Sequence, residues 1–138
     1  MSFHLTVVTP EGEAYDKDVD GVVLPGTEGE FGVLTGHEPF MTGLQPGTLQ
    51  ISAGSELLFA AVGRGFAEIH ENTVSVLVNS CEFAHEIDRS RAEIARDRAL
   101  AQLQEMRASA EGEAAYRELQ ETYSRAVARI AATDRFKG

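Results

Sequence analysis

Arginines with helical spacing are the residues of this sequence best suited to chemistry. They are Arg89, Arg91, Arg96 and Arg98 in the stretch EFAHEIDRSRAEIARDRAL, and Arg125 and Arg129 near the end of the chain. A guanidinium group binds a carboxylate or a phosphate through two parallel hydrogen bonds. The whole chain has a net charge of -10 at pH 7, so any anion-binding site must be local.

The spacing predicts that four of these arginines meet. At about 100° per residue, Arg91 and Arg98 lie on one flank of a narrow stripe of small and apolar residues, and Arg125 and Arg129 lie on the same-handed flank of a second stripe. The stripes are Ala92, Ala95, Ala99, Leu103 and Met106, and Ala115, Leu119, Thr122, Ala126 and Ile130. Same-handed flanks meet in an antiparallel helix pair, so the four guanidinium groups would share one groove suited to phosphate.

Ordinary surface salt bridges are the alternative interpretation. Glu86, Asp88, Glu93 and Asp97 have the i, i+3 and i, i+4 spacing that pairs them with nearby arginines. Such pairs contribute a few tenths of a kcal/mol each. From the pattern alone, this interpretation is favoured over a bound polyanion.

Composition narrows the class of protein. The chain has 138 residues, of which 43% are hydrophobic, so it can bury a core. Its excess of 22 acidic over 12 basic residues excludes nucleic acid and an anionic membrane surface as partners for the molecule as a whole. The single cysteine, Cys81, cannot form an internal disulfide, which favours the cytoplasm. No apolar run spans a bilayer and no signal peptide is recognisable, so direct membrane insertion is not expected.

The chain changes character near residue 84. All four prolines and 11 of the 13 glycines precede that point, among short β-branched and aromatic runs that predict a sandwich or barrel over residues 1–84. The run IHENTVSVL predicts a hairpin that turns at Glu71 and Asn72. Residues 85–138 have helical periodicity, which predicts two antiparallel helices over about 87–108 and 113–132.

Two other patterns are weaker candidates for chemistry. Cys81 and His85 are spaced i, i+4 and could form a nucleophile and its base, but no oxyanion partner accompanies them. The stretch GTEGEFG lacks the Lys and Ser/Thr of a phosphate-binding P-loop. The surrounding EGEFGVLTGHEP predicts a series of turns in which Gly29, Gly32 and Gly36 adopt positive φ. The four histidines lack metal-ligand spacing, so no metal site is expected.

The sequence as a whole resembles the epsilon subunit of the bacterial F-type ATP synthase. The resemblance rests on VVTPEGEAYDKDVDGVVLPGTEGEFGVLTGHEPFMTGLQPGTLQI, on GRGFAEIHENTVSVL, and on IDRSRA at the start of the helical region. It implies a mainly β plus α fold, with an N-terminal β-sandwich of about ten strands followed by a C-terminal antiparallel two-helix hairpin. The domains would be residues 1–84 and 85–138.

The resemblance also implies a function. The sandwich would dock on the gamma subunit and on the membrane rotor ring of c subunits, at the cytoplasmic face of the bacterial plasma membrane. The hairpin would either fold beside the sandwich or extend along the central stalk, where it meets the alpha and beta subunits and inhibits ATP hydrolysis. The chain would be a non-catalytic subunit that couples rotor rotation to ATP synthesis and requires no cofactor.

The resemblance further implies individual site residues. In some members of the family the folded hairpin binds ATP, with or without Mg²⁺, as a regulatory ligand. The residues that match are Glu82, Ile87, Asp88, Arg91, Ala92, Arg98, Arg125 and Arg129, with Glu82 as an acceptor for the adenine amino group. Glu30 and His37 match the part of the sandwich that contacts the rotor ring. These matches favour nucleotide binding over simple salt bridges, and sensing over hydrolysis.

Two rival classes remain open at this stage. One is a free-standing cytosolic nucleotide-sensing domain that uses the same arginines without any motor. The other is a small hydrolase that uses the Cys81 thiol. Co-purification with other ATP synthase subunits separates the first rival from a motor subunit, and loss of activity on Cys81→Ala would be needed to support the second.

Overall fold

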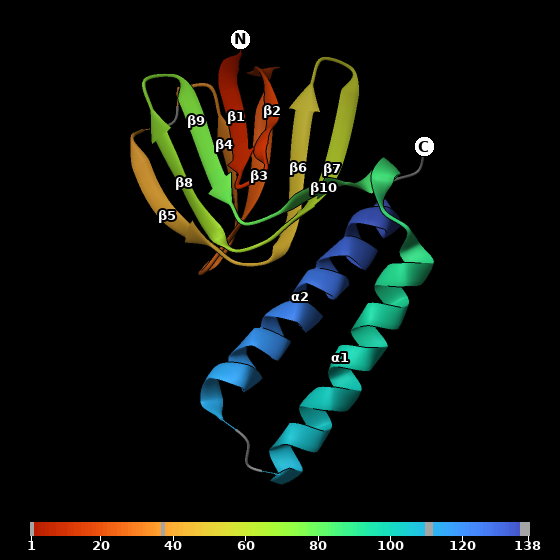
Figure 1. Cartoon of the computed structure of the whole chain (residues 1–138). Coiled ribbons are helices and arrows are strands. Elements are labelled where there is room, and N and C mark those ends of the chain that lie inside the picture. Colours follow the sequence, from red (N-terminus) through yellow and green to blue (C-terminus); the bar gives the residue numbers. More distant parts are fainter. Residues whose placement is uncertain (1, 37, 110–111, 136–138) are drawn as a thin grey trace.

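Residues up to about 84 alternate between buried and exposed positions in short runs, and these runs form ten strands (Figure 1). The computed structural model describes residues 2–36, 38–109 and 112–135, and only the backbone of residues 107–109. The strands are β1 (Phe3–Thr9), β2 (Gly12–Val19), β3 (Gly21–Gly26), β4 (Gly29–Leu34), β5 (Phe40–Leu44), β6 (Gly47–Ala53), β7 (Glu56–Val62), β8 (Gly65–His70), β9 (Thr73–Val78) and β10 (Cys81–Phe83). A 3₁₀ helix, Ala84–Glu86, leads to α1 (Arg89–Ser109) and α2 (Glu113–Arg135).

The strands fold over one another into a nearly closed sandwich. Their order is β10-β7-β6-β3-β5-β8-β9-β1-β2, with β4 paired to β3. Among the described strands only β1 and β9 are parallel partners. Contacts between β2 and β6 bring opposite parts of the sheet together. The predicted fold class, a sandwich of about ten strands followed by a helical hairpin, is confirmed.

The sandwich closes its core with its own side chains. Eighteen buried hydrophobic residues form this core, and among the described residues all of them lie between Phe3 and Val78. Leu5, Leu24 and Ile51 are completely buried in it. The described side chains of the helices therefore add no fully buried residue to the core of the sandwich.

Two turn predictions meet different outcomes. Glu71 and Asn72 have φ values of 45° and 63° and connect the paired residues His70 and Thr73, as a hairpin turn of this type requires, so that prediction is confirmed. The predicted series of turns over EGEFGVLTGHEP is wrong at Gly32. This residue lies inside β4 opposite Val23, because β4 is a regular antiparallel partner of β3.

The helices begin and end close to the predicted residues. The Arg91 amide donates to the Asp88 side chain over 3.2 Å, which is the geometry of a helix N-cap. An N-cap residue is non-helical, so α1 begins at Arg89 rather than at Ile87. At the other end α2 continues to Arg135, three residues beyond the predicted end at 132.

The hairpin rests on the sandwich through α2 (Figure 1). α2 contacts β6 and β7, whereas α1 packs mainly against α2. We call the contact zone the alanine seam: it consists of Ala61, Ala84, Ala128 and Ala132, with Phe59 and Ile87 against them. A buried methyl group contributes only about 0.8 kcal/mol. The alanine seam therefore holds the hairpin weakly.

Polar ties between α2 and the sandwich add to the alanine seam. Among the described residues they join Arg129 with Glu82 (2.7 and 3.0 Å), Arg135 with Gln50 (3.1 Å), and Glu121 with both Asn79 (3.0 Å) and Arg64 (4.0 Å). In each tie a side chain of α2 contacts a residue of the sandwich or of the loop before β10. The position of the hairpin thus depends on side chains along α2 rather than on a shared hydrophobic core.

A charged cluster holds the edge strand β2 against β1. The His4 ring lies between the carboxylates of Asp18, at 2.8 Å, and Asp16. Hydrogen bonds to Asp18 and then Asp16 raise the pKa of His4, and the bond from His4 lowers the pKa of Asp16. The cluster stabilises the fold in the pH interval between those two pKa values.

This cluster predicts a pH-dependent effect of His4→Gln. Because the folded-state pKa of His4 is raised, its contribution is complete below the unfolded value of about 6.5 and disappears as pH rises through the folded value. The substitution should lower the Tm by a few degrees near pH 6 and leave it unchanged near pH 9, as measured by thermal denaturation. His70→Gln, at an exposed position on β8, is the control. An equal loss at both pH values would contradict this assignment.

Candidate functional site

A cavity of about 280 Å³ lies where the hairpin meets the sandwich. Its walls come from β7, the segment 80–82, α1 and α2: Ala61, Val62, Ser80, Glu82, Ala95, Thr122, Arg125, Ala126 and Arg129. Glu82, Arg125 and Arg129, which the family resemblance assigned to one site, therefore line one cavity. In the described part of the chain, the cavity has two cationic side chains and one carboxylate in its walls.

Arg129 and Glu82 form a bidentate ion pair at this cavity. The Arg129 Nε donates to Glu82 Oε1 over 2.7 Å, and Nη2 donates to Oε2 over 3.0 Å. The hydrogen bond to Glu82 raises the pKa of Arg129. Both side chains are about one third exposed, at 35% and 36%. Glu82 thus meets an arginine from α2, a pairing that the spacing within the helices could not indicate.

Arg91, Arg98 and Arg125 have no carboxylate partner in the part of the chain that the structure describes. All three are exposed, and no carboxylate of the described residues lies within 4.0 Å of them. The salt bridges expected from the helical spacing do not form here. The three guanidinium groups therefore carry positive charge that no nearby described carboxylate compensates.

The carboxylates that were candidates for those salt bridges contact other groups. Asp97 pairs with Arg96 at 3.0 Å, and Glu93 lies 3.8 Å from Arg89. Arg89 also pairs with Asp134 of α2. The two arginines that the sequence placed outside the groove are therefore neutralised.

The structure does not bring all four predicted arginines into one cavity. Arg91 and Arg98 lie on α1, whose one described contribution to the cavity wall is Ala95. The remaining matched residues have local structural roles. Ile87 is half-buried against the alanine seam, Asp88 caps α1, and Ala92 is completely buried.

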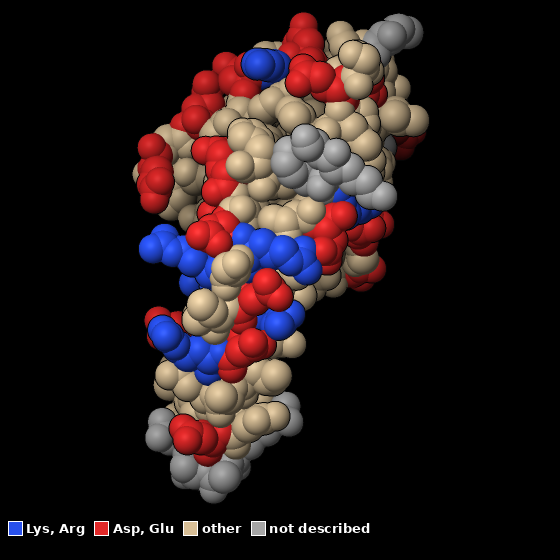
Figure 2. All heavy atoms as spheres, turned by 90° about the vertical axis from the view of Figure 1, so that its right-hand side faces the viewer, with Lys and Arg blue, Asp and Glu red and all other residues tan. Residues whose placement is uncertain are grey.

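Charge is distributed unevenly between the two parts of the molecule. Residues 1–84 contain 12 of the 22 acidic residues but only 2 of the 12 basic residues, so the net charge of -10 belongs to the sandwich and the hairpin is neutral. Figure 2 shows Lys and Arg gathered below the sandwich, on the hairpin, with acidic side chains between them. A phosphate-bearing ligand would therefore be repelled less at the hairpin, where arginines are gathered, than at the acidic sandwich.

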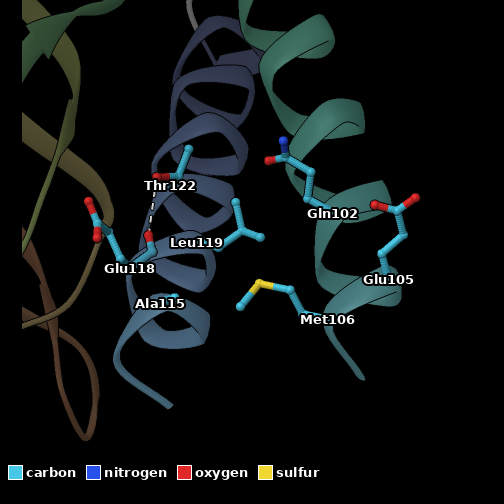
Figure 3. Close-up of a pocket in the computed structure, with 7 residues that line it drawn as sticks. All are labelled: Gln102, Glu105, Met106, Ala115, Glu118, Leu119 and Thr122. Carbon is cyan, nitrogen blue, oxygen red and sulfur yellow. Dashed lines mark hydrogen bonds between the residues drawn. The ribbon is translucent and has the colours of Figure 1, made fainter. Parts of the chain in front are cut away.

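A larger cavity, of about 710 Å³, lies between the distal halves of the helices. Figure 3 shows Met106 and Leu119 pointing toward each other across it. Its walls are Gln102, Glu105, Met106, Ala115, Glu118, Leu119 and Thr122. No cationic side chain of the described residues lines this cavity, and two carboxylates do, so it does not suit an anion.

The thiol hydrolase interpretation lacks a reactive thiol. Burial, with smaller contributions from Glu86 and Glu82, raises the pKa of Cys81 to about 12. The thiolate is the nucleophilic form, and it is absent at neutral pH when the pKa is so high. Among the described residues no group of three or more His, Cys, Asp or Glu side chains could hold a metal ion.

Of the two predicted rotor-contact residues, only Glu30 lies within the described part of the sandwich. Glu30 is exposed on β4, while His37 lies outside the described residues. Leu34 and Met41 are 69% and 60% exposed nearby in the sequence, and the rings of Phe31 and Phe40 meet edge to face at 5.8 Å. The sequence analysis missed these exposed apolar side chains, because strand alternation alone does not tell which face of an edge strand is covered.

Comparison with known proteins identifies the family. Residues 2–84 match the family model described as ATP synthase, Delta/Epsilon chain, beta-sandwich domain. The ATP synthase epsilon chain of Cyanothece sp. is 36% identical over 132 residues, 96% of this chain and 95% of the relative. That of Nitratidesulfovibrio vulgaris (strain DP4) is 46% identical over 107 residues, 75% of this chain and 80% of the relative.

Solved structures support the fold independently. A chain in the cryo-EM structure of the Euglena gracilis mitochondrial ATP synthase, OSCP/F1/c-ring in rotational state 1, matches with a TM-score of 0.80. It is 24% identical, and the match covers 95% of this chain and 81% of that chain. In the described part of the molecule, no helix is long and apolar enough to cross a membrane. The chain therefore belongs to the family of ATP synthase epsilon chains, which are non-catalytic subunits of that complex.

Proposed function

We propose that the chain works in the central stalk of a proton-translocating F-type ATP synthase at the cytoplasmic face of the bacterial plasma membrane. There the sandwich docks on the gamma subunit and on the ring of c subunits and couples rotation to ATP synthesis. The relatives are bacterial epsilon chains, and the similar structure belongs to an assembly that contains F1 and a c-ring. Pull-down from bacterial membranes should recover gamma and catalytic subunits, whereas a free-standing nucleotide sensor would come down alone.

Exposed apolar side chains on the sandwich support a docking role. Phe66 and Leu77 are opposite each other on β8 and β9 and are 43% and 41% exposed. Leu34 and Met41 are more exposed still, at the β4 side. Apolar surface of this kind marks interaction sites on soluble domains. The acidic character of the sandwich favours partners with basic surfaces.

The hairpin acts as a regulatory element that binds ATP, with or without Mg²⁺, in its folded state. The observation that supports this proposal is a difference between the arginines. Arg89 and Arg96 form ion pairs with carboxylates, whereas Arg91, Arg98 and Arg125 have no carboxylate partner among the described residues. Unpaired guanidinium groups on one part of an acidic protein suit a polyphosphate. Because the alanine seam is weak, the hairpin can also leave the sandwich, contact the alpha and beta subunits and restrain ATP hydrolysis.

Removing an unpaired arginine should weaken ATP binding. A charge-assisted hydrogen bond contributes about 1.5 to 3 kcal/mol, so Arg91→Ala or Arg125→Ala should each raise the Kd for ATP by roughly tenfold to a hundredfold in calorimetric titrations with and without Mg²⁺. Arg89→Ala is the matched control. It loses the Asp134 contact and should lower the Tm without changing the Kd. A similar Kd for all three variants would contradict the site.

Charge reversal at Glu30 tests the contact with the ring. Glu30 is exposed, and no described residue forms an ion pair with it, so Glu30→Lys should leave the Tm of the isolated protein nearly unchanged. In the assembled enzyme it should reduce proton-driven ATP synthesis at an unchanged proton gradient. A large drop in the Tm, with coupling intact, would instead assign Glu30 to the stability of the sandwich.

Deletion of residues 87–138 tests the hairpin as a brake. The sandwich core contains no fully buried side chain from the described helices, so the truncated chain should still unfold cooperatively on heating. Assembled into the enzyme, it should raise the rate of ATP hydrolysis because the inhibitory element is gone. A truncated chain that folds but leaves hydrolysis unchanged would exclude this regulatory role.

A further inference from the structure

The Glu82 carboxylate occupies the guanidinium group that an anion would need. The Arg129 Nε and Nη2 are two parallel hydrogen-bond donors, and both donate to the Glu82 carboxylate, at 2.7 and 3.0 Å. Two phosphate oxygens would make the same pair of parallel hydrogen bonds. The Glu82 carboxylate therefore occupies the place on Arg129 that a phosphate group would take.

Nothing else in the described cavity wall competes in this way. Glu82 is the one acidic residue among the lining residues, and the neighbouring Arg125 has no carboxylate within 4.0 Å in the described part of the chain. The Thr122 hydroxyl already donates to the Glu118 carbonyl over 3.1 Å. A polyphosphate that enters the cavity can therefore bind Arg125 directly, whereas the Glu82 carboxylate already occupies the hydrogen-bond donors of Arg129.

We propose that Glu82 is a built-in competitor of phosphate at Arg129, so that polyphosphate binds the hairpin by displacing the Glu82 carboxylate. This inference rests on the proposed binding of ATP and adds how that site is regulated. No covalent bond changes: two phosphate oxygens replace Oε1 and Oε2 on the same two guanidinium nitrogens.

The displacement also changes how the hairpin is held. Glu82 lies on β10 and Arg129 on α2, so their ion pair is one of the polar ties between the sandwich and the hairpin. A phosphate on Arg129 removes this tie and leaves the contacts of Arg135 with Gln50 and of Glu121 with Asn79 and Arg64. Anion binding and hairpin docking are therefore coupled through one side chain.

The test measures binding of inorganic tripolyphosphate to the full chain by calorimetry. Tripolyphosphate has the charged oxygens of ATP without a base, so any role of Glu82 toward adenine does not enter. Glu82→Gln should lower the Kd for tripolyphosphate by about threefold to fivefold, because Arg129 is then free to bind the ligand. Glu86→Gln is the matched control: it removes the same charge four residues away, outside the cavity wall, and should change the Kd by less than about twofold.

Arg129→Ala separates competition from general repulsion. In the Arg129→Ala background, Glu82→Gln should no longer improve binding, because the competition is for Arg129 itself. A Glu82→Gln variant that binds no more tightly than the wild type, or that gains as much without Arg129, overturns this inference and leaves ATP sensing intact. If neither ATP nor tripolyphosphate binds the wild type or the variant, the proposed sensing fails as well. Circular dichroism checks that each variant folds.

Discussion

The sandwich completes its hydrophobic core before the helices begin, and the behaviour of the hairpin follows from this constraint. The core residues lie between Phe3 and Val78, so α2 rests on the outside of a finished domain. Its apolar contacts are those of the alanine seam, in which Phe59 and Ile87 pack against four alanine methyl groups that contribute about 0.8 kcal/mol each. A helix pair attached in this way can be displaced without unfolding the domain that holds it.

Charge separates the two parts of the molecule as clearly as packing does. The sandwich has the whole net charge of -10, whereas the hairpin is neutral but contains arginines without carboxylate partners among the described residues. The acidic surface repels a polyphosphate from the sandwich, and the unpaired guanidinium groups attract it to the hairpin. An overall acidic protein can in this way bind an anionic regulator at one place and a basic protein surface at another.

The sequence predicted those features that depend on neighbours along the chain. Strand alternation, the hairpin turn at Glu71 and Asn72 and the helical periodicity after residue 84 are local, and periodicity or turn chemistry revealed them. The pairing of Glu82 with Arg129 joins residues 47 positions apart and depends on how α2 lies on the sandwich. Helical periodicity gives the flank on which an arginine lies. It does not give the neighbouring domain that neutralises it.

The energetic scale of these contacts decides whether a ligand can control the hairpin. The Glu82–Arg129 pair is about one third exposed, and an ion pair of that kind contributes about 1 kcal/mol or less. A ligand present at 100 times its Kd and bound only to the docked hairpin stabilises that state by about 2.7 kcal/mol. An anion that replaces Glu82 therefore supplies more stabilisation than the tie it removes. The exchange favours the docked hairpin even though it breaks one of the contacts that hold the hairpin in place.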